Sequence, residues 1–204
     1  MARRTKDEAA ATRESILDAA ITLFLDHGVS RTSLDQIAKQ ANCTRGAVYH
    51  HFTNKAEVLK ELLDSVRLPT EELFDQFEEY EKDQPLKAIQ LWCRQAFEIL
   101  LSSERCQRIH TIFYYRCEFV DETNPARVSE LQMIRDCHDR FTAQFQRASE
   151  LGQLRPDLSP EDVSYLLHSY CVGIYSNTLK EPWCQMIKLH VDPMLDVFFK
   201  GIQP

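Results

Sequence analysis

Hydrophobic and polar positions alternate along most of the chain with the period of an α-helix. Between residues 9 and 27 the apolar side chains recur three or four positions apart, which is the spacing of one helix face. These side chains are Ile16, Ala20, Leu23 and Phe24. Gly28 follows directly, and glycine often ends a helix because it adopts a left-handed backbone without strain. The pattern therefore predicts an amphipathic helix over Ala9–His27.

The same spacing predicts a series of further helices, so the expected fold class is all-α with about nine helices. A long helix begins at Asn54, where Asn54 and Glu57 match the pattern of a capping box. Pro69 is expected to kink or end this helix near Leu68, because proline has no N–H donor and clashes with the preceding turn. The later predicted helices run from Pro85 to Leu100, over Glu104–Phe119 and Ala126–Leu151, from Pro160 to a stop at Pro182, and over Trp183–Lys200.

The stretch Ser33–Phe52 has the pattern of two short helices joined by a tight turn. Ser33 is placed to cap the first helix, with Gln36 three residues later to complete a capping box. Asn42 stands where the turn needs a left-handed residue, which asparagine tolerates better than most residues. Thr44 is placed to cap the second helix. The side chains expected to face inward are Leu34, Ile37, Ala38, Ala41, Ala47, Val48 and Phe52.

The outer side of the second short helix carries polar, aromatic and glycine residues. They are Thr44, Arg45, Gly46, Tyr49, His50 and His51. Small residues permit close approach to a DNA major groove, while donors meet phosphates and base edges. The pattern therefore predicts a helix-turn-helix that reads DNA. An ordinary helical hairpin with a solvated face is the alternative.

Basic residues flank this motif on both sides. Arg3, Arg4 and Lys6 precede any apolar pattern and form an arm that is placed to contact phosphates or the minor groove. A frayed, solubilising terminus would explain the same residues. Lys55 lies near the start of the next helix, where the helix dipole does not favour a cation. A contact with an anionic DNA phosphate would explain a lysine at this position. Together with Ser33, these residues complete the predicted DNA contacts.

Several segments resemble the TetR family of transcriptional regulators. The DNA-binding domain of that family is similar to Thr-Arg-Gly-Ala-Val-Tyr-His-His-Phe-Thr-Asn-Lys at 44–55, preceded by Arg-Thr-Ser-Leu-Asp-Gln-Ile-Ala at 31–38. The opening Ala-Arg-Arg-Thr-Lys-Asp-Glu-Ala and the later Arg-Cys-Glu-Phe at 116–119 resemble more narrowly the AcrR/TtgR-type repressors of multidrug efflux genes. Two positions depart from the family pattern. The family usually has Gly in place of Asn42, and commonly Trp or another aromatic in place of His50.

Composition is that of a globular, helical protein. The 204 residues are 44% hydrophobic and 27% charged, with only 5 Gly and 8 Pro. No apolar run approaches 18 residues and the N-terminus is polar and basic, so neither a membrane span nor an export signal is expected. Seven cysteines, an odd number without framework spacing, fit a reducing compartment and a cytoplasmic location.

The charge of the chain is unevenly distributed. Its net charge of −7 combines +2 over residues 1–55, from eight Lys/Arg against six Asp/Glu, with −9 over the remainder, from sixteen against twenty-five. The acidic part would repel DNA and help to orient the basic end toward it. The negative total is therefore weak evidence against DNA binding.

The helices after residue 85 carry more polar and aromatic residues on their inner faces than a plain core requires. Those that the pattern allows to converge are Trp92, Cys93, His110, Phe113, Tyr114, Cys117, Cys137, Phe141, His168, Tyr170, Cys171 and Ser176. A cavity of aromatics, thiols and a few donors suits a flat, lipophilic ligand, whereas a filled helical core with satisfied histidines is the alternative. The resemblance to efflux repressors implies that a drug pocket is lined by Trp92, Ala96, His110, Tyr114, Cys137, Phe141, His168, Cys171, Val172 and Ser176.

The cysteines and histidines are compatible with two other roles. Cys137 and His138, with Cys117 and His110, would offer metal ligands, but no C-x-x-C or H-x-x-x-H spacing supports a metal site. A thiol switch is the stronger alternative, because cysteines are numerous and Cys43 lies inside the DNA motif. The sequence has no paired carboxylates placed for acid–base catalysis, no Gly-rich phosphate loop and no nucleophile elbow. Neither an enzyme nor a cofactor is expected.

The sequence thus predicts a DNA-binding head at residues 1–53 and a ligand-binding and dimerisation body at residues 54–204. The resemblance implies a homodimer formed by the last two long helices. The helices at 160–180 and 184–200 also carry apolar residues on more than one face, more than one core should use: Tyr165 beside Leu166 and Leu167, and Val197 beside Phe198 and Phe199. Two heads would meet successive major grooves of a palindromic operator, with centres about 34–36 Å apart or a multiple of that. A small lipophilic effector that favours another spacing would release the DNA. Repression itself is implied by the resemblance alone.

Overall fold

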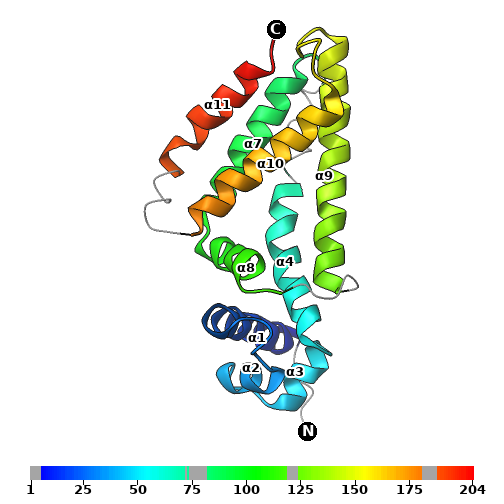
Figure 1. The fold of residues 1–204 in the computed structure, drawn as a ribbon. Coiled ribbons are helices and arrows are strands. Elements are labelled where there is room, and N and C mark those ends of the chain that lie inside the picture. Colours follow the sequence, from blue (N-terminus) through cyan, green and yellow to red (C-terminus); the bar gives the residue numbers. More distant parts are fainter. Residues whose placement is uncertain (1–5, 72, 74–81, 119–123, 181–187) are drawn as a thin grey trace. The chain divides into compact units, whose positions relative to one another are not determined.

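The structure of the chain, a computed structural model, describes residues 6–71, 73, 82–118, 124–180 and 188–204. Within these residues it contains nine α-helices and no β-strand, which confirms the all-α prediction (Figure 1). The helices are α1 (Lys6–His27), α2 (Leu34–Gln40), α3 (Arg45–His51), α4 (Lys55–Glu71), α7 (Pro85–Ser102), α8 (Glu104–Tyr115), α9 (Pro125–Glu150), α10 (Pro160–Thr178) and α11 (Val191–Gly201).

The chain folds into two compact units. Unit 1 comprises Met1–Val66 and Arg108–Glu130, and unit 2 comprises Arg67–Gln107 and Leu131–Pro204. Unit 1 therefore holds α1, α2, α3, most of α4 and α8, and the first residues of α9. Unit 2 holds α7, α10, α11 and most of α9. The predicted domain boundary after residue 53 stays a prediction, because unit 1 is built from two separate stretches of the sequence.

The core of unit 1 joins the three N-terminal helices to the start of α4. Each of these helices contributes a fully buried side chain, namely Phe24, Ile37, Val48 and Leu62. Arg13 of α1 adds a link on the rim of this core, because its Nη1 lies 2.6 Å from Oε1 of Glu61 and its guanidinium lies 5.2 Å from the ring centroid of Phe52. Helices as short as α2 and α3 are marginal in isolation, so this packing is what stabilises them.

The core of unit 2 is formed by α7, α9, α10 and α11. Its most buried side chains include Phe145, Leu167, Leu195 and Phe199. Arg94 of α7 ties the last helix to this core, since its two terminal nitrogens lie 2.8 Å from Asp192 and 2.5 Å from Asp196. The Gln90 amide also donates to Asp196, at 2.7 Å. The C-terminal helix is therefore held to α7 by both apolar packing and charge pairs.

Two predicted helices are confirmed with shifts of one to three residues, and a third begins at the predicted residue. Helix α1 begins at Lys6 rather than Ala9, and α9 spans Pro125–Glu150 rather than Ala126–Leu151. Helix α10 begins at Pro160 as predicted, and the Ser159 hydroxyl caps it by accepting from the Asp162 amide at 3.1 Å. These boundaries are set by residues within one turn of the helix end, which is why the sequence alone predicted them.

Two predicted helix ends were wrong. Helix α4 does not end near Leu68 but continues through Pro69 to Glu71, because a proline in the last turn removes only one backbone donor. The other expected effect of Pro69, a kink in the helix, stays a prediction. Helix α8 ends at Tyr115 rather than Phe119. The Arg116 carbonyl accepts a hydrogen bond from the Val29 amide at 3.0 Å, so the chain leaves the helix at this point to meet a distant loop.

The predicted last helix begins later than expected. Residues 188–190 form a turn of 3₁₀-helix, and the α-helix α11 begins only at Val191, so a continuous helix from Trp183 was also a wrong prediction. Trp183 itself and Pro182, the expected stop of the preceding helix, lie outside the described residues. The basic residues Arg3 and Arg4 lie outside them as well.

Removal of a core ring from α9 should destabilise unit 2 strongly. Phe145 is fully buried, and a Phe→Ala change at such a site typically costs about 3–5 kcal/mol because it removes apolar contact and leaves a cavity. Phe145→Ala should therefore lower the urea midpoint of unit 2, measured by far-ultraviolet circular dichroism. The neighbouring exposed variant Gln146→Ala should change the free energy of unfolding by less than about 0.5 kcal/mol. Equal effects of the two variants would contradict the assigned core.

Candidate nucleic-acid interface

The helix-turn-helix is built by short-range hydrogen bonds that the sequence predicted. The Ser33 hydroxyl accepts from the Gln36 amide at 3.2 Å, and the Gln36 side-chain oxygen accepts from the Ser33 amide at 2.8 Å. This pair is the predicted capping box at the start of α2. Asn42 has a φ of +51°, so the turn does contain the predicted left-handed residue. Both findings fix the direction in which the chain enters α3.

Helix α3 presents the predicted side chains on its outer face. The Thr44 hydroxyl caps the helix by accepting from the Ala47 amide at 3.1 Å, while Val48 and Phe52 are buried below it. Ala47, which was expected to face inward, is only half-buried. The exposed residues of this segment are Thr44, Arg45, Gly46, Tyr49 and His50, and His51 is half-buried. The structure thus gathers the predicted α3 contacts on one short helix, with a polar outer side and an apolar inner side.

The Arg45 side chain is held in place by two neighbours. Its Nε lies 3.0 Å from a carboxylate oxygen of Asp35 on α2, and its Nη2 donates to the Tyr49 hydroxyl at 3.4 Å. The guanidinium also lies 5.2 Å from the centroid of the Tyr49 ring. The hydrogen bond with Tyr49, followed by the Asp35 charge, raises the pKa of Arg45 above its ordinary value. All three side chains are exposed, so the cation is oriented on the surface without being buried.

Lys55 has partners inside the protein that the sequence did not reveal. Its ammonium donates to the Val29 carbonyl at 2.7 Å and to the Ser30 carbonyl at 3.0 Å, in the loop between α1 and α2. Partial burial lowers the pKa of Lys55, which is the expected effect of withdrawing an ammonium from water. The two carbonyl oxygens supply an intramolecular reason for a cation at the start of α4. A contact between Lys55 and a DNA phosphate stays a prediction.

The predicted capping box at the start of α4 is formed by different partners. The Asn54 side chain caps the helix by accepting from the Glu57 amide at 3.0 Å, as expected. The Glu57 carboxylate, however, accepts from the Thr53 amide at 2.8 Å and from the Thr53 hydroxyl at 2.7 Å, not from Asn54. These hydrogen bonds lower the pKa of Glu57. The sequence pattern does not single out Thr53, because this residue lies one position before the cap and outside the capping-box spacing. Its hydroxyl adds a second donor to the Glu57 carboxylate.

The loop between α1 and α2 is fixed by hydrogen bonds to the end of α1, within the loop itself and to the residue that follows α8. Gly28 has a φ of +82° and its amide donates to the Phe24 carbonyl at 2.9 Å, which ends α1. The buried Thr32 hydroxyl donates to the Gly28 carbonyl at 2.8 Å. The Val29 amide donates to the carbonyl of Arg116, which follows α8. Only the glycine could be predicted from the sequence, because the other partners depend on the tertiary fold.

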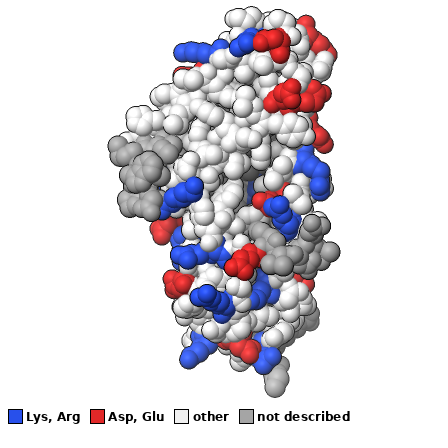
Figure 2. All heavy atoms as spheres, viewed as in Figure 1, with Lys and Arg blue, Asp and Glu red and all other residues white. Residues whose placement is uncertain are grey.

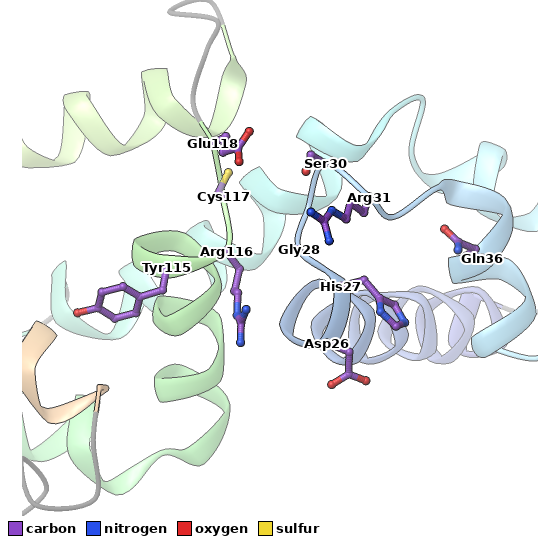
Figure 3. A pocket seen from close by; sticks show the side chains of 10 residues that line it. All are labelled: Asp26, His27, Gly28, Ser30, Arg31, Gln36, Tyr115, Arg116, Cys117 and Glu118. Carbon is purple, nitrogen blue, oxygen red and sulfur yellow. The ribbon is translucent and has the colours of Figure 1, made fainter.

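Two hollows border this loop in unit 1. One, of about 530 Å³, is lined by Asp26, His27, Gly28, Ser30, Arg31, Gln36, Tyr115, Arg116, Cys117 and Glu118. Arg31 and Arg116 enter it from its two sides (Figure 3). The other, of about 470 Å³, is lined by Ser30, Arg31, Thr32, Ser33, Leu34, Asp35, Tyr49, Thr53, Asn54 and Lys55. The second hollow brings together three predicted DNA contacts, since Ser33, Tyr49 and Lys55 all border it.

The residues predicted to line a ligand cavity fall into both units. Those in unit 1 are His110, Phe113, Tyr114 and Cys117. Those in unit 2 are Trp92, Cys93, Ala96, Cys137, Phe141, His168, Tyr170, Cys171, Val172 and Ser176. The structure brings members together within each unit, and the convergence of the two sets in one cavity stays a prediction.

The unit 1 members differ in burial: Phe113 is buried, His110 and Cys117 are half-buried, and Tyr114 is exposed. The rings of His110 and Tyr114 stack with centroids 6.2 Å apart. Desolvation by the surrounding protein raises the pKa of Tyr114 to about 12 and that of Cys117 to about 11.

Six of the unit 2 members belong to or pack on one apolar cluster: Trp92, Cys93, Cys137, Phe141, Tyr170 and Cys171. Cys93, Phe141 and Ala96 are buried, and Trp92 meets Phe141 edge to face with ring centroids 5.0 Å apart. The Tyr170 hydroxyl donates to the Met194 carbonyl at 2.9 Å. Burial, and then the nearby His138, lowers the pKa of His168. The remaining members, Cys137, Cys171, Val172 and Ser176, are half-buried. An aromatic pair beside thiols and a neutral imidazole is the environment predicted for a lipophilic ligand.

The part of the chain that the structure describes contains neither a candidate metal site nor a candidate membrane span. No group of three His, Cys, Asp or Glu side chains there could hold a metal ion. The metal alternative drawn on Cys137, His138, Cys117 and His110 has no support in these residues. None of the described helices has both the length and the apolar character needed to span a bilayer.

Family models of known proteins match both the N-terminal and the C-terminal part of the chain. The family model described as "Bacterial regulatory proteins, tetR family" matches residues 16–62, and the model described as "MAATS-type transcriptional repressor, C-terminal region" matches residues 84–203. The HTH-type transcriptional regulator TtgR of Pseudomonas putida is 36% identical over 182 residues, which cover 89% of this chain and 87% of the relative.

Solved structures extend the likeness to three dimensions. The crystal structure of NalD, the secondary repressor of the MexAB-OprM multidrug efflux pump in Pseudomonas aeruginosa, is similar with a TM-score of 0.87 at 35% identity, covering 97% of this chain and 98% of that one. The SmeT–triclosan complex is similar with a TM-score of 0.76 at 33% identity, covering 95% and 92%. SmeT is the repressor of the Stenotrophomonas maltophilia multidrug efflux pump SmeDEF.

The Lys55 ammonium should contribute to the stability of unit 1. Lys55→Met keeps most of the apolar stem and leaves the Val29 and Ser30 carbonyls without their charged donor. Hydrogen bonds to charged groups are worth about 1.5–3 kcal/mol when buried. Because Lys55 is partly exposed, we expect a loss of about 1 kcal/mol in a urea titration. Lys39→Met, at an exposed position of α2, is the control.

The same variant distinguishes this role from a phosphate contact. If Lys55→Met left the unfolding midpoint unchanged and reduced the slope of log K against log salt for DNA binding by about one, Lys55 would be a phosphate ligand instead.

Proposed function

The chain belongs to the TetR family of bacterial regulatory proteins, and from this membership we propose that it is a transcriptional repressor that a small effector releases from DNA. In this proposal the helix-turn-helix of unit 1 binds a palindromic operator as part of a homodimer. The effector is a lipophilic, aromatic compound, and the regulated genes encode a multidrug efflux pump. The protein acts as a regulator rather than an enzyme and works in the cytoplasm, where the DNA is.

The observation that carries the DNA-binding proposal is the outer face of α3. It combines a capped N-terminus, a glycine that permits close approach and an arginine held ready for a base or phosphate. A Cβ added at Gly46 would meet only the helix cap, at 3.9 Å from the Thr44 hydroxyl, so the face is open above this glycine. A helix of this kind fits a major groove because backbone and side-chain donors can approach the bases together.

The homodimer proposal is supported by apolar side chains that the single chain leaves exposed. Tyr165 and Leu166 of α10 are 61% and 53% exposed, and Val197 of α11 is 70% exposed. The surface over α10 is also largely uncharged in the view of Figure 2. Exposed apolar surface on neighbouring helices marks protein interfaces, and a second copy is the partner that a palindrome requires.

The effector proposal is supported by the composition of unit 2 and by relatives. The edge-to-face pair of Trp92 and Phe141 offers flat apolar surface, with Tyr170 as a polar group in the same cluster. NalD and SmeT are named as repressors of multidrug efflux pumps, and SmeT was solved with triclosan, a compound of this chemical type. An apolar ligand gains affinity from burial in such a site, and a few polar groups orient it.

Release follows from a difference in affinity between two states of the dimer. The DNA-binding state holds the two α3 helices at the pitch of the operator, about 34–36 Å or a multiple of that. An effector that binds better to a state with another spacing shifts the population toward that state. A coupling of about 1.4 kcal/mol changes DNA affinity tenfold.

A thiol-based redox regulator is the second candidate function. Cys43 supports it, because this half-buried thiol lies between α2 and α3. Two other thiols weaken it, since burial raises the pKa of Cys117 to about 11 and hydrogen bonding and burial raise that of Cys93 well above its ordinary value. The thiolate is the species that peroxide attacks, so neutral thiols are poor sensors of peroxide.

Selection of bound sequences from a random DNA pool tests the proposal, with and without a panel of lipophilic aromatic compounds. A palindrome recovered without compounds and lost with at least one of them is the expected result. Recovery of no palindrome would show a non-specific DNA binder. Release by peroxide alone, reversed by a reducing agent, would establish the redox function in place of the drug response.

Arg45 should contribute to operator discrimination. Its guanidinium already stands on the outer face of α3, so Arg45→Ala should lower the preference for the operator over unrelated DNA by about 1–3 kcal/mol if it contacts a base. Asp35→Ala should instead raise the preference for the operator over unrelated DNA, because it removes the carboxylate that competes with DNA for Arg45. Fluorescence anisotropy with specific and scrambled duplexes measures both effects. An unchanged preference in Arg45→Ala would rule out a base contact by this residue.

A charge on the exposed face of α11 should dissociate the dimer. Val197→Lys places a cation where the proposed interface is apolar, so sedimentation should show monomers and palindrome binding should weaken at least tenfold. Val128→Lys is the matched control, because Val128 is 48% exposed and lies in unit 1. The control should remain dimeric. A dimeric Val197→Lys variant that binds the palindrome normally would contradict the assigned interface.

A further inference from the structure

Three helices of unit 2 each direct a cysteine at the same apolar cluster. Cys93 comes from α7, Cys137 from α9 and Cys171 from α10. Cys93 is only 1% exposed, while the other two are half-buried and pack against the cluster. Cys93 and Cys171 carry free thiols. None of the three cysteines takes part in the DNA-binding geometry, so the cluster needs its own explanation.

Two of these thiols are in direct contact. The Cys93 and Cys171 side chains are hydrogen-bonded to one another, and Cys137 lies near enough to act on Cys93 electrostatically. The Cys93 thiol is fully enclosed, so the Cys171 thiol is the more accessible member of the pair. The edge-to-face rings of Trp92 and Phe141 lie in the same cluster. A pair of adjacent thiols therefore stands beside flat aromatic surface.

The protonation state of the pair limits its chemistry. The hydrogen bond between the two thiols, together with burial, raises the pKa of Cys93 well above its ordinary value. A thiol that stays neutral reacts poorly with oxidants that need the thiolate. A reagent that replaces both thiol hydrogens and leaves a neutral product has no such disadvantage, because no charge is left in an apolar core.

We propose that Cys93 and Cys171 form a dithiol site for lipophilic trivalent arsenicals, which bridge two neighbouring thiols. An organoarsenous acid loses its two hydroxyl groups and the thiols lose their two protons, so two water molecules leave. Two sulfur–arsenic bonds form and no atom changes its oxidation state. The first bond forms at the accessible Cys171, and Cys93 then displaces the second hydroxyl. The aromatic group on arsenic lies against the Trp92 and Phe141 rings.

This ligand class fits the number of thiols present. Trivalent arsenic bound to one carbon needs only two sulfur ligands, whereas thiol-bound metal ions in proteins commonly need three or four protein ligands. No group of three His, Cys, Asp or Glu in the described residues could hold a metal ion. Closure of the second bond is intramolecular, so the bridged adduct gains from a high effective concentration and resists competing monothiols. The site shares Trp92 and Phe141 with the proposed effector site, so the inference rests on that part of the proposed function and names a further ligand class for it; its occupation requires no DNA.

Intact-mass spectrometry of the full chain with phenylarsine oxide tests the site. The folded protein is incubated with the reagent and excess glutathione, and its free thiols are then counted under denaturing conditions. Wild-type protein should gain one phenylarsenic group in place of two hydrogens and lose two reactive thiols. The adduct should persist in glutathione and be removed by a dithiol such as 2,3-dimercaptopropanol.

Single substitutions identify the pair. Cys171→Ala and Cys93→Ala should each abolish the glutathione-resistant adduct. Cys106→Ala, which removes a buried thiol outside the pair, should retain it. Circular dichroism melts confirm that each variant is folded, and Cys171, being half-buried, is the less disruptive of the two positions. No adduct on folded wild-type protein would overturn the inference. So would an adduct that survives loss of Cys93 or Cys171, or one that is lost in Cys106→Ala. If the arsenical adduct formed as expected but selection from random DNA recovered no palindrome, only the DNA-binding part of the proposed function would be contradicted.

Discussion

The geometry of unit 1 depends on the backbone of Val29 and Ser30, in the loop between α1 and α2. The Val29 amide donates to the Arg116 carbonyl, and the carbonyls of Val29 and Ser30 both accept from the Lys55 ammonium. Backbone polar groups withdrawn from water must find partners, and this loop finds them in two segments far away in sequence. The loop therefore joins the end of α1, the start of α4 and the residues after α8.

This junction also sets the position of the DNA-reading helix. Thr32 lies at the end of the joined loop, with its hydroxyl bound to the Gly28 carbonyl, and Ser33 immediately caps α2. The turn at Asn42 then fixes the angle between α2 and α3. Each step is short and well bonded, so the exposed face of α3 has little freedom relative to α1. A rigid support of this kind is what base recognition needs, because contacts to bases require side chains in defined places.

The sequence predicted the elements whose causes are local. The capping box of Ser33 and Gln36, the left-handed Asn42 and the Thr44 cap all depend on residues within three positions, and each is found in the structure. The outer face of α3 followed from the same short-range pattern. The family resemblance supplied what the pattern could not, namely a ligand-responsive repressor, and membership of the family was confirmed by comparison. The positions of the ligand residues stay predictions, because they depend on helix packing across both units.

Distant partners decided two features that the sequence pattern did not reveal. Helix α8 ends early because the Arg116 carbonyl bonds to Val29, and Lys55 serves the same loop although its position suggested a phosphate. Amide hydrogen exchange of Val29 in the free protein tests this account most directly. Val29 should exchange as slowly as Ile112 of α8 and with the same dependence on denaturant, because one cooperative opening exposes both. An amide of Val29 that exchanges at the rate of an open loop, while Ile112 stays protected, would contradict the account.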